Sequence, residues 1–554
     1  MNDMVDAGEG LDPITVEVVR HKIEGIADEM EETLLRSSFS PIVKEGLDAS
    51  ASLFLADGTT LAQATAIPIH LATLIPAVAT MIERFPVETM RPGDLYLLND
   101  PYSGGTHLPD LAVAMPVFHG DRVIALSATM THHQDVGGMT PGSVPTNATE
   151  VFQEGIRIPA VKLRDGETFD ETLLAMLQLN VRMPDVFMGD LNAQIAACTV
   201  GARRLAETAE VYGGNELAAI FANLIERSEA MTRAALAALP EGRYRYVNYL
   251  DNDGIDLETP IRIEVEANIA DGAVHFDFTG SSPQVKGPLN CVPSGTQAAA
   301  FYAVRAVTDP EIPTNGGCFR PVSLTLPEGS IVNPKAPAPV NARTATIKAI
   351  TNCILGALAQ AAPDRMPAMN CGALLVLAFG GQHDDGESFI VGDLIAGGSG
   401  ASAGLDGVDV IETDASNCMN LPAEALEMEA PIRLLACRLR PDSGGPGRYR
   451  GGLGVVREYE ILTDGIRLSH RGERHTRAAD GLAGGGPGAM AHSVILRADG
   501  AEEVIASKCV TTLNRGDRLL VETAGGGGHG PAAERDPAAR AADVADGKVG
   551  GAAQ

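Results

Sequence analysis

The chain has 554 residues, of which 45% are hydrophobic and 21% charged, a balance typical of a globular protein with several folding units. Its formal net charge of −30 disfavours a phosphate backbone or an anionic lipid surface as a partner. Aromatic residues make up only 4% of the chain and tryptophan is absent, which argues against single-strand nucleic-acid binding by base stacking. Nucleic acid and membrane are therefore poor partners, although a local basic pocket could still hold a small anion.

Cysteine usage and the N-terminal segment predict a cytoplasmic protein. The eight cysteines are widely spaced and form no C-x-x-C pair, so we expect reduced thiols in the core. The acidic, polar start MNDMVDAGEGLDP has the character of neither a signal nor a transit peptide. No apolar run reaches the roughly 18 residues that a membrane helix needs.

The N-terminal part predicts helices mixed with a sheet. Asp12-Pro13 is a helix cap followed by proline, and apolar residues at helical spacing then predict a helix over 13–36. An alternating segment around the turn Asp57-Gly58 predicts a hairpin. Residues 70–85 predict a second helix, with Pro76 as a possible kink. Strands are then expected over 93–100, 111–118 and 122–131.

The rest of the chain changes character twice. Two long, alanine-rich periodic segments within 168–238 predict a helical pair. A hairpin is expected around Asp271-Gly272, and helices over 296–308 and 344–362. Short strands alternate with glycine-rich turns up to about residue 523, and a short polar helix follows in the tail.

These patterns predict a multi-domain α+β protein with largely antiparallel sheets and a long helical pair in the middle. The expected segments are a mixed α/β metal-site domain (1–165), a helical segment (166–240), a β-rich domain (241–345), an α+β glycine-rich domain (346–524) and a C-terminal tail (525–554).

The segments NDPYSGGTHLPDLAV and THHQDVGG concentrate carboxylates and imidazoles at the ends of successive predicted strands. Neighbouring strands lie ~4.8 Å apart, so side chains at their ends can converge. The residues are His107, Asp110, His132, His133 and Asp135.

Alternation along residues 122–133 places Ile124, Leu126, Ala128 and Met130 on the same face as His132, and places His133 and Asp135 on the other. A buried imidazole beside buried carboxylates is typical of a metal ligand or a general base. His107 and Asp110 can join it only if their loop turns. Hydrogen-bonded surface structure is the alternative. Imidazole and carboxylate ligands without a thiolate would suit Zn²⁺, Mn²⁺ or Fe²⁺.

A basic segment, HRGERHTRAADGLAGGGPG, stands out in this acidic chain. His470, Arg471, Arg474 and His475 could hold an anionic substrate or a phosphate, or could form a solvated turn with local ion pairs. Its glycine run lacks the GK[ST] ending of a Walker A loop. Asp48, just before a predicted strand, is by pattern only a charged strand start.

With these residues in view, the chain resembles the hydantoinase B/oxoprolinase family nearly end to end. The segments that carry the resemblance include KEGLDASASLF, IPIHL, NDPYSGGTHLPDLAVAMPVF, THHQDVGGMTPGSVPTNATEVFQEGIRIPAVKL, GDLNAQIAA, DFTGSSPQVKGPLN, IPTNGGCFRPVSLTLPEGSIVNPKAPAPVNAR, the basic segment above and GGGGHGPAAERDP.

The resemblance implies one subunit of a cytoplasmic, heteromeric, ATP-dependent enzyme. An A-type partner subunit with an actin-like ATPase fold would use the ATP to activate a cyclic amide, and this B-type subunit would complete its hydrolysis, as in N-methylhydantoinases and 5-oxoprolinases. It also implies a divalent metal held by Asp48, His107, Asp110 and His132, with His133, Asp135 and Glu154 as catalytic or supporting residues. Two alternatives remain open, a subunit of an acetone- or acetophenone-type carboxylase and a non-catalytic scaffold for the ATPase subunit.

Overall fold

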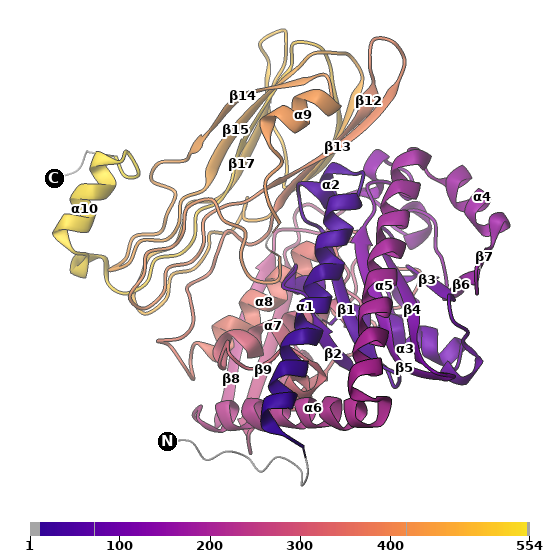
Figure 1. Cartoon of the computed structure of the whole chain (residues 1–554). Coiled ribbons are helices and arrows are strands. Elements are labelled where there is room, and N and C mark those ends of the chain that lie inside the picture. Colours follow the sequence, from indigo (N-terminus) through magenta and orange to yellow (C-terminus); the bar gives the residue numbers. More distant parts are fainter. Residues whose placement is uncertain (1–10, 71, 417, 551–554) are drawn as a thin grey trace.

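The computed structural model describes residues 11–550 except 71 and 417. Four sheets and a set of helices make up this part of the chain (Figure 1). Every strand pair assigned in it is antiparallel except β10 with β11, which confirms the predicted α+β class with largely antiparallel sheets. The helices are α1 (Pro13–Ser37), α2 (Pro41–Lys44), α3 (Leu74–Arg84), α4 (Glu171–Asn180), α5 (Pro184–Tyr212), α6 (Gly214–Ala237), α7 (Pro293–Val307), α8 (Arg343–Leu358), α9 (Ala423–Glu429) and α10 (Pro537–Ala545).

A seven-stranded sheet in the order β2-β1-β5-β4-β3-β6-β7 forms the N-terminal region. Helices α1 and α5 lie side by side on one of its faces, and α3 packs on the other (Figure 1). Both faces of the central strands are therefore buried. The strands are β1 (Ala49–Leu55), β2 (Thr60–Gln63), β3 (Leu95–Leu98), β4 (Asp110–His119), β5 (Arg122–His132), β6 (Val161–Asp165) and β7 (Thr168–Phe169).

Helix α1 begins where its cap predicts, because the Asp12 carboxylate accepts hydrogen bonds from the backbone N–H groups of Ile14 and Thr15. Helix α3 begins at Leu74, four residues later than expected. Pro76 lies in its first turn, where no intrahelical N–H donor is needed, so it causes no kink. His70 consequently lies in a separate 3₁₀ turn ahead of the helix.

The middle of the chain places helices against a second sheet. Helix α6 turns away from α5 at Gly213 and crosses below α1 (Figure 1). Helices α7 and α8 pack on a four-stranded sheet in the order β11-β10-β9-β8, around the largest apolar cluster of the described residues. Its strands are β8 (Gly242–Leu250), β9 (Ile261–Ala270), β10 (Ala273–Asp277) and β11 (Val322–Thr325).

Two further sheets, β13-β12-β16-β19 and β14-β15-β20-β17-β18, face each other across a shared apolar cluster and form a sandwich. Glycine-rich segments leave it side by side and run toward α10 (Figure 1). They hydrogen-bond through their backbones, as from Gly526 N–H to the Gly452 carbonyl at 3.0 Å. A Cβ at Gly526 would overlap the Ser399 carbonyl, so only glycine allows this spacing. The strands are β12 (Leu375–Gln382), β13 (Ser388–Ile395), β14 (Ile432–Leu439), β15 (Val455–Ile461), β16 (Ile466–Arg471), β17 (His492–Leu496), β18 (Glu502–Val504), β19 (Lys508–Leu513) and β20 (Arg518–Glu522).

Two global expectations can be compared with this fold. Among the described residues, no helix combines the length and the apolar character that crossing a bilayer requires. All eight cysteines are free, and six of them are buried, as expected for core thiols. The predicted domain boundaries stay predictions.

Candidate metal centre

The loop after β3 is fixed before it reaches the candidate ligands. The Asn99 side-chain amide donates to the Leu108 carbonyl at 2.7 Å, and its oxygen accepts from the Ile158 N–H at 2.7 Å. The Asp100 carboxylate accepts from Arg157, with a shortest distance of 2.9 Å. Gly104 has a φ of 99°, and a Cβ there would press against the Pro76 carbonyl. The loop therefore makes the turn that His107 and Asp110 need in order to converge.

Three predicted ligands meet at one point. Asp110 opens β4 and lies directly opposite His132, the last residue of β5. The Asp110 Oδ1 atom lies 2.8 Å from His107 Nε2 and 3.3 Å from His132 Nδ1, and the two imidazole nitrogens are 3.1 Å apart. Within the described part of the chain, these residues are the group of three whose ligand atoms are close enough to share a metal ion. All three side chains are buried.

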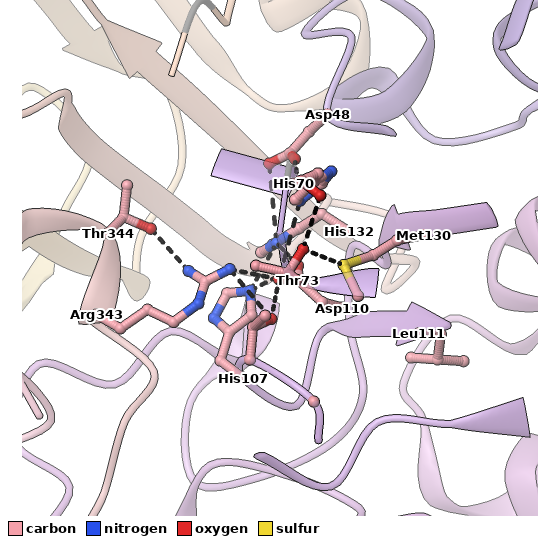
Figure 2. A network of polar contacts seen from close by, with 12 residues as sticks. Asp48, His70, Thr73, His107, Asp110, Leu111, Met130, His132, Arg343 and Thr344 are labelled. Atoms are coloured by element: carbon pink, nitrogen blue, oxygen red, sulfur yellow. Dashed lines mark hydrogen bonds and ion pairs between the residues drawn. The ribbon is translucent and has the colours of Figure 1, made fainter. Parts of the chain in front are cut away.

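Asp48 and His70 complete a ring of ligand-type side chains around this point (Figure 2). Asp48 Oδ2 lies 3.9 Å from His132 Nδ1, so Asp48 is near the triad of His107, Asp110 and His132 without touching it. His70 Nε2 lies 3.7 Å from Asp48 Oδ1 and 4.0 Å from Asp110 Oδ2. The His70 Nδ1 atom is buried and has no hydrogen-bond partner among the described residues.

His70 was not among the predicted site residues. The available signal was its place at the end of IPIH, a segment that already carried the family resemblance. His70 was not considered as a ligand because residues 70–85 were expected to form a helix, and a histidine in a regular amphipathic helix gives no reason to expect metal binding.

The protonation states suit a cation. Burial, and then the Arg343 guanidinium, lower the pKa of His107 to about 3, although Asp110 opposes them. Burial also lowers the pKa of His70. Burial alone would raise the pKa of Asp110, but the Arg343 guanidinium holds it well below its usual value. Neutral imidazoles and an ionised carboxylate are the forms that bind a metal ion.

Arg343, the first residue of α8, is a buried partner that sequence reasoning missed. Its guanidinium bonds to Asp110 Oδ2, and its Nη1 donates to Thr344 Oγ1 at 2.8 Å. Asp110 Oδ1 therefore faces the imidazoles of His107 and His132, while Oδ2 faces Arg343 (Figure 2). The available signal was its place at the end of APVNAR, in a segment that carried the family resemblance, since spacing along the chain does not connect it to the loop.

A backbone carbonyl orients His107. Its Nδ1 lies 3.1 Å from the Asn341 carbonyl oxygen, which can only accept, so Nδ1 carries the hydrogen and Nε2 offers its lone pair to the centre. The Asn341 and Val340 N–H groups donate to the Glu154 carboxylate at 2.8 and 2.9 Å. Burial raises the pKa of Glu154 to about 8, although these donors oppose it. Glu154 thus lies behind His107 and holds the segment that orients it.

His133 and Asp135 point elsewhere. As alternation predicts, His133 faces the side opposite His132, where its Nε2 lies 3.0 Å from Gln194 Oε1 and its ring packs on Phe187. Asp135 accepts from the Arg182 guanidinium at 2.8 Å and from three backbone N–H groups. Their catalytic roles stay predictions.

The four residues predicted from the basic segment lie in different surroundings. His470 contacts Ser493 Oγ at 2.9 Å, Arg474 contacts the Ala478 carbonyl at 3.3 Å, and the His475 N–H donates to Asp251 at 2.8 Å. These three residues therefore have partners outside the cavity that lies beside the triad. Of the four predicted anion-binding residues, Arg471 is the one that lines this cavity.

That cavity lies between the N-terminal sheet, the start of α8 and the strands β12 and β13. Its polar wall contains Asp48, His70, His107, His132, Gln134, Arg343 and Arg471, and its apolar wall includes Ile67, Ile69, Leu374, Val376, Ile390 and Leu394. A small molecule in it would touch both the ligand cluster and an apolar surface, the usual composition of a substrate site.

A buried cluster of imidazoles and a carboxylate in such a cavity defines a candidate metalloenzyme component. Residues 12–532 match the model of the hydantoinase B/oxoprolinase family, and the chain belongs to that family. An uncharacterized protein of Methanocaldococcus jannaschii is 36% identical over 97% of this chain and 94% of its own. The B-type component of a putative D-/L-hydantoinase from a Pseudomonas species is 33% identical over 97% of this chain and 93% of its own.

Two solved structures share the fold. The ATP-dependent caprolactamase of Pseudomonas jessenii superposes with a TM-score of 0.91 at 30% identity, over 98% of this chain and 95% of that one. A nucleotide-free acetone carboxylase superposes with a TM-score of 0.90 over 98% of this chain and 78% of that one. Its identity is 22%, so it supports the fold alone.

Proposed function

We propose that this chain is the metal-dependent B-type subunit of an ATP-dependent cyclic-amide hydrolase. The observation that carries the proposal is the convergence of His107, Asp110 and His132 within 3.3 Å of one another. Relatives named for hydantoinase and caprolactamase support the reaction class. The substrate is a hydantoin, oxoproline or related lactam, activated with ATP by a separate A-type subunit.

The donor set fits a divalent ion. His107, Asp110 and His132 would hold it, with Asp48 and His70 in reach after small side-chain movements. The buried Nδ1 of His70 has no hydrogen-bond partner among the described residues, which leaves this imidazole able to turn toward an ion. Such an ion, Zn²⁺, Mn²⁺ or Fe²⁺, supplies Lewis acidity that polarises a carbonyl and lowers the pKa of water.

The residues of the chain supply orientation and exclusion of water. Asn341 fixes the His107 tautomer, Arg343 keeps Asp110 ionised, and the apolar wall shields the reacting group from bulk water. An amide resists attack because its nitrogen donates into the carbonyl, so activation by the ATP-using subunit has to come first. A closed route between the two subunits would protect the activated species.

The test is to purify the chain with its A-type partner, assay ring opening of cyclic amides with and without ATP, and measure metal content. ATP-coupled ring opening that disappears in His107→Ala together with the metal supports the proposal. Product formation that requires bicarbonate, without ring opening, would indicate a ketone carboxylase. Full activity in His107→Ala would indicate a scaffold.

A further inference from the structure

Arg471, at the end of β16, is a buried cation without an ion-pair partner. Its exposed fraction is 8%, and among the described residues no carboxylate oxygen lies within 4.0 Å of its guanidinium. Its hydrogen bond is a long one, from Nη1 to the Asn341 carbonyl at 3.4 Å. Buried Arg457, by contrast, pairs with Asp393 at 2.9 Å. A buried charge is costly unless it is paired.

The position of Arg471 shows what its charge faces. The Asn341 carbonyl that accepts from Arg471 also accepts from His107 Nδ1, so the guanidinium lies beside a candidate metal ligand. Arg471 and Arg343 both line the cavity, and burial followed by the nearby Arg343 charge lowers the pKa of Arg471 to about 10. Arg474 also lacks a carboxylate partner among the described residues, but it does not line this cavity.

Arg471 is the cation of the cavity that is left without a carboxylate partner. Arg343 also lines the cavity but pairs with Asp110, and among the described lining residues Asp48 is the single carboxylate. The lining also includes Arg343 and Thr344, the first two residues of α8, and the N-terminus of a 16-residue helix adds positive potential. An arginine fork matches the oxygens of a phosphate or a carboxylate.

We propose that Arg471, supported by Arg343, binds an oxyanion group of the molecule that reaches the metal centre. The cavity is then a site for an anionic, activated substrate with an apolar body, and a neutral amide is bound poorly. The oxyanion is either a phosphoryl group or a carboxylate, which share this recognition. The assignment as a substrate site rests on the proposed function, whereas anion binding by Arg471 can be measured without it.

The experiment titrates the full-length chain with inorganic phosphate and, separately, with acetate, by calorimetry. Arg471→Gln is expected to weaken binding of one of the two anions at least tenfold. The matched control is Arg467→Gln, an exposed arginine on the same strand, which is expected to leave binding unchanged. Phosphate-selective binding identifies a phosphoryl group, and acetate-selective binding a carboxylate. If neither anion binds in a way that depends on Arg471, the proposal is overturned.

The contributions of the metal and of Arg471 to anion binding are distinguished in two ways. The titration is repeated after chelation, and the metal content of each variant is measured by elemental analysis. Anion binding that follows metal content and is equal in wild type and Arg471→Gln would overturn the proposal. If every preparation lacks metal, the proposed function fails, and the effect of Arg471→Gln on anion binding still decides this inference.

A second measurement avoids dependence on a variant that could fail to fold. Wild-type crystals soaked in tungstate should show anomalous density within hydrogen-bond distance of the Arg471 guanidinium. Density only at other sites, or none, contradicts the assignment. Arg471→Lys, which keeps the charge but loses the fork, is expected to fold and to recover only part of the affinity.

Discussion

Asp110 and His132 face each other as register partners across β4 and β5, with Asp110 Oδ1 3.3 Å from His132 Nδ1. Side chains opposite each other on antiparallel strands are held close by the backbone ladder, so this pair is preorganised. His107 joins it from a loop of the same meander. The centre therefore depends on strand register more than on loop flexibility.

Removing either imidazole should release the metal. His107→Ala and His132→Ala are each expected to lower the metal content of the purified chain at least tenfold, because one of few ligands is lost. Elemental analysis measures this directly. His119→Ala, at the far, partly exposed end of β4, is the control and should retain metal. Equal metal content in the wild type and all three variants would contradict the assigned ligands.

Two variants of Glu154 can show whether this residue orients His107 or transfers a proton. Glu154→Gln keeps one oxygen that can accept from the Asn341 and Val340 N–H groups, so metal affinity should stay within a few-fold of wild type. Glu154→Ala frees the segment that orients His107 and should weaken metal binding about 10- to 100-fold. Metal titrations of both variants test this. A Glu154→Gln variant that binds metal normally but has lost ring opening would show that Glu154 itself transfers a proton.

His470 should make the protein less stable in acid. Burial, and then His475, lower its pKa to about 3, below the value of about 6.5 expected in an unfolded chain. Between pH 6.5 and 3 the unfolded chain binds a proton that the folded protein excludes, so stability falls as the pH falls, by up to about 1.4 kcal/mol per pH unit.

Thermal melting across this pH range tests the effect. His470→Gln is expected to melt lower than wild type at pH 7, because the bond to Ser493 is altered, yet to lose less stability on acidification. Parallel pH profiles for the two proteins would mean that His470 does not contribute.

A glycine-to-alanine substitution should have opposite effects on stability in a closely packed glycine-rich segment and on the exposed face of a helix. Gly526→Ala should lower the melting temperature, because its Cβ would overlap the Ser399 carbonyl and overpacking typically costs about 1–3 kcal/mol. Gly25→Ala, exposed within α1 and with no neighbouring atom within 4 Å, should raise it, by about 1 kcal/mol in helix propensity. A Gly526→Ala protein as stable as wild type would show that the segments separate easily.

Several features of the fold could be predicted because local rules decide them. The Asp12 cap set the start of α1, and alternation along β5 correctly placed His132 and His133 on opposite faces. The expectation failed at residue 70, where an apolar run suggested a helix that actually begins at Leu74. That error removed His70 from the predicted site.

The sequence by itself determined the class of the fold, because alternation along strands and short turns depend on residues close together in the chain. Its resemblance to a known family indicated the family and the three residues that converge. Only the tertiary structure decided which residues complete the site. Asn341 and Arg343 contact His107 and Asp110 from hundreds of residues away, and Arg471 contacts the Asn341 carbonyl. Packing of α8 and β16 against the N-terminal sheet brings them there, and no local pattern encodes such a contact.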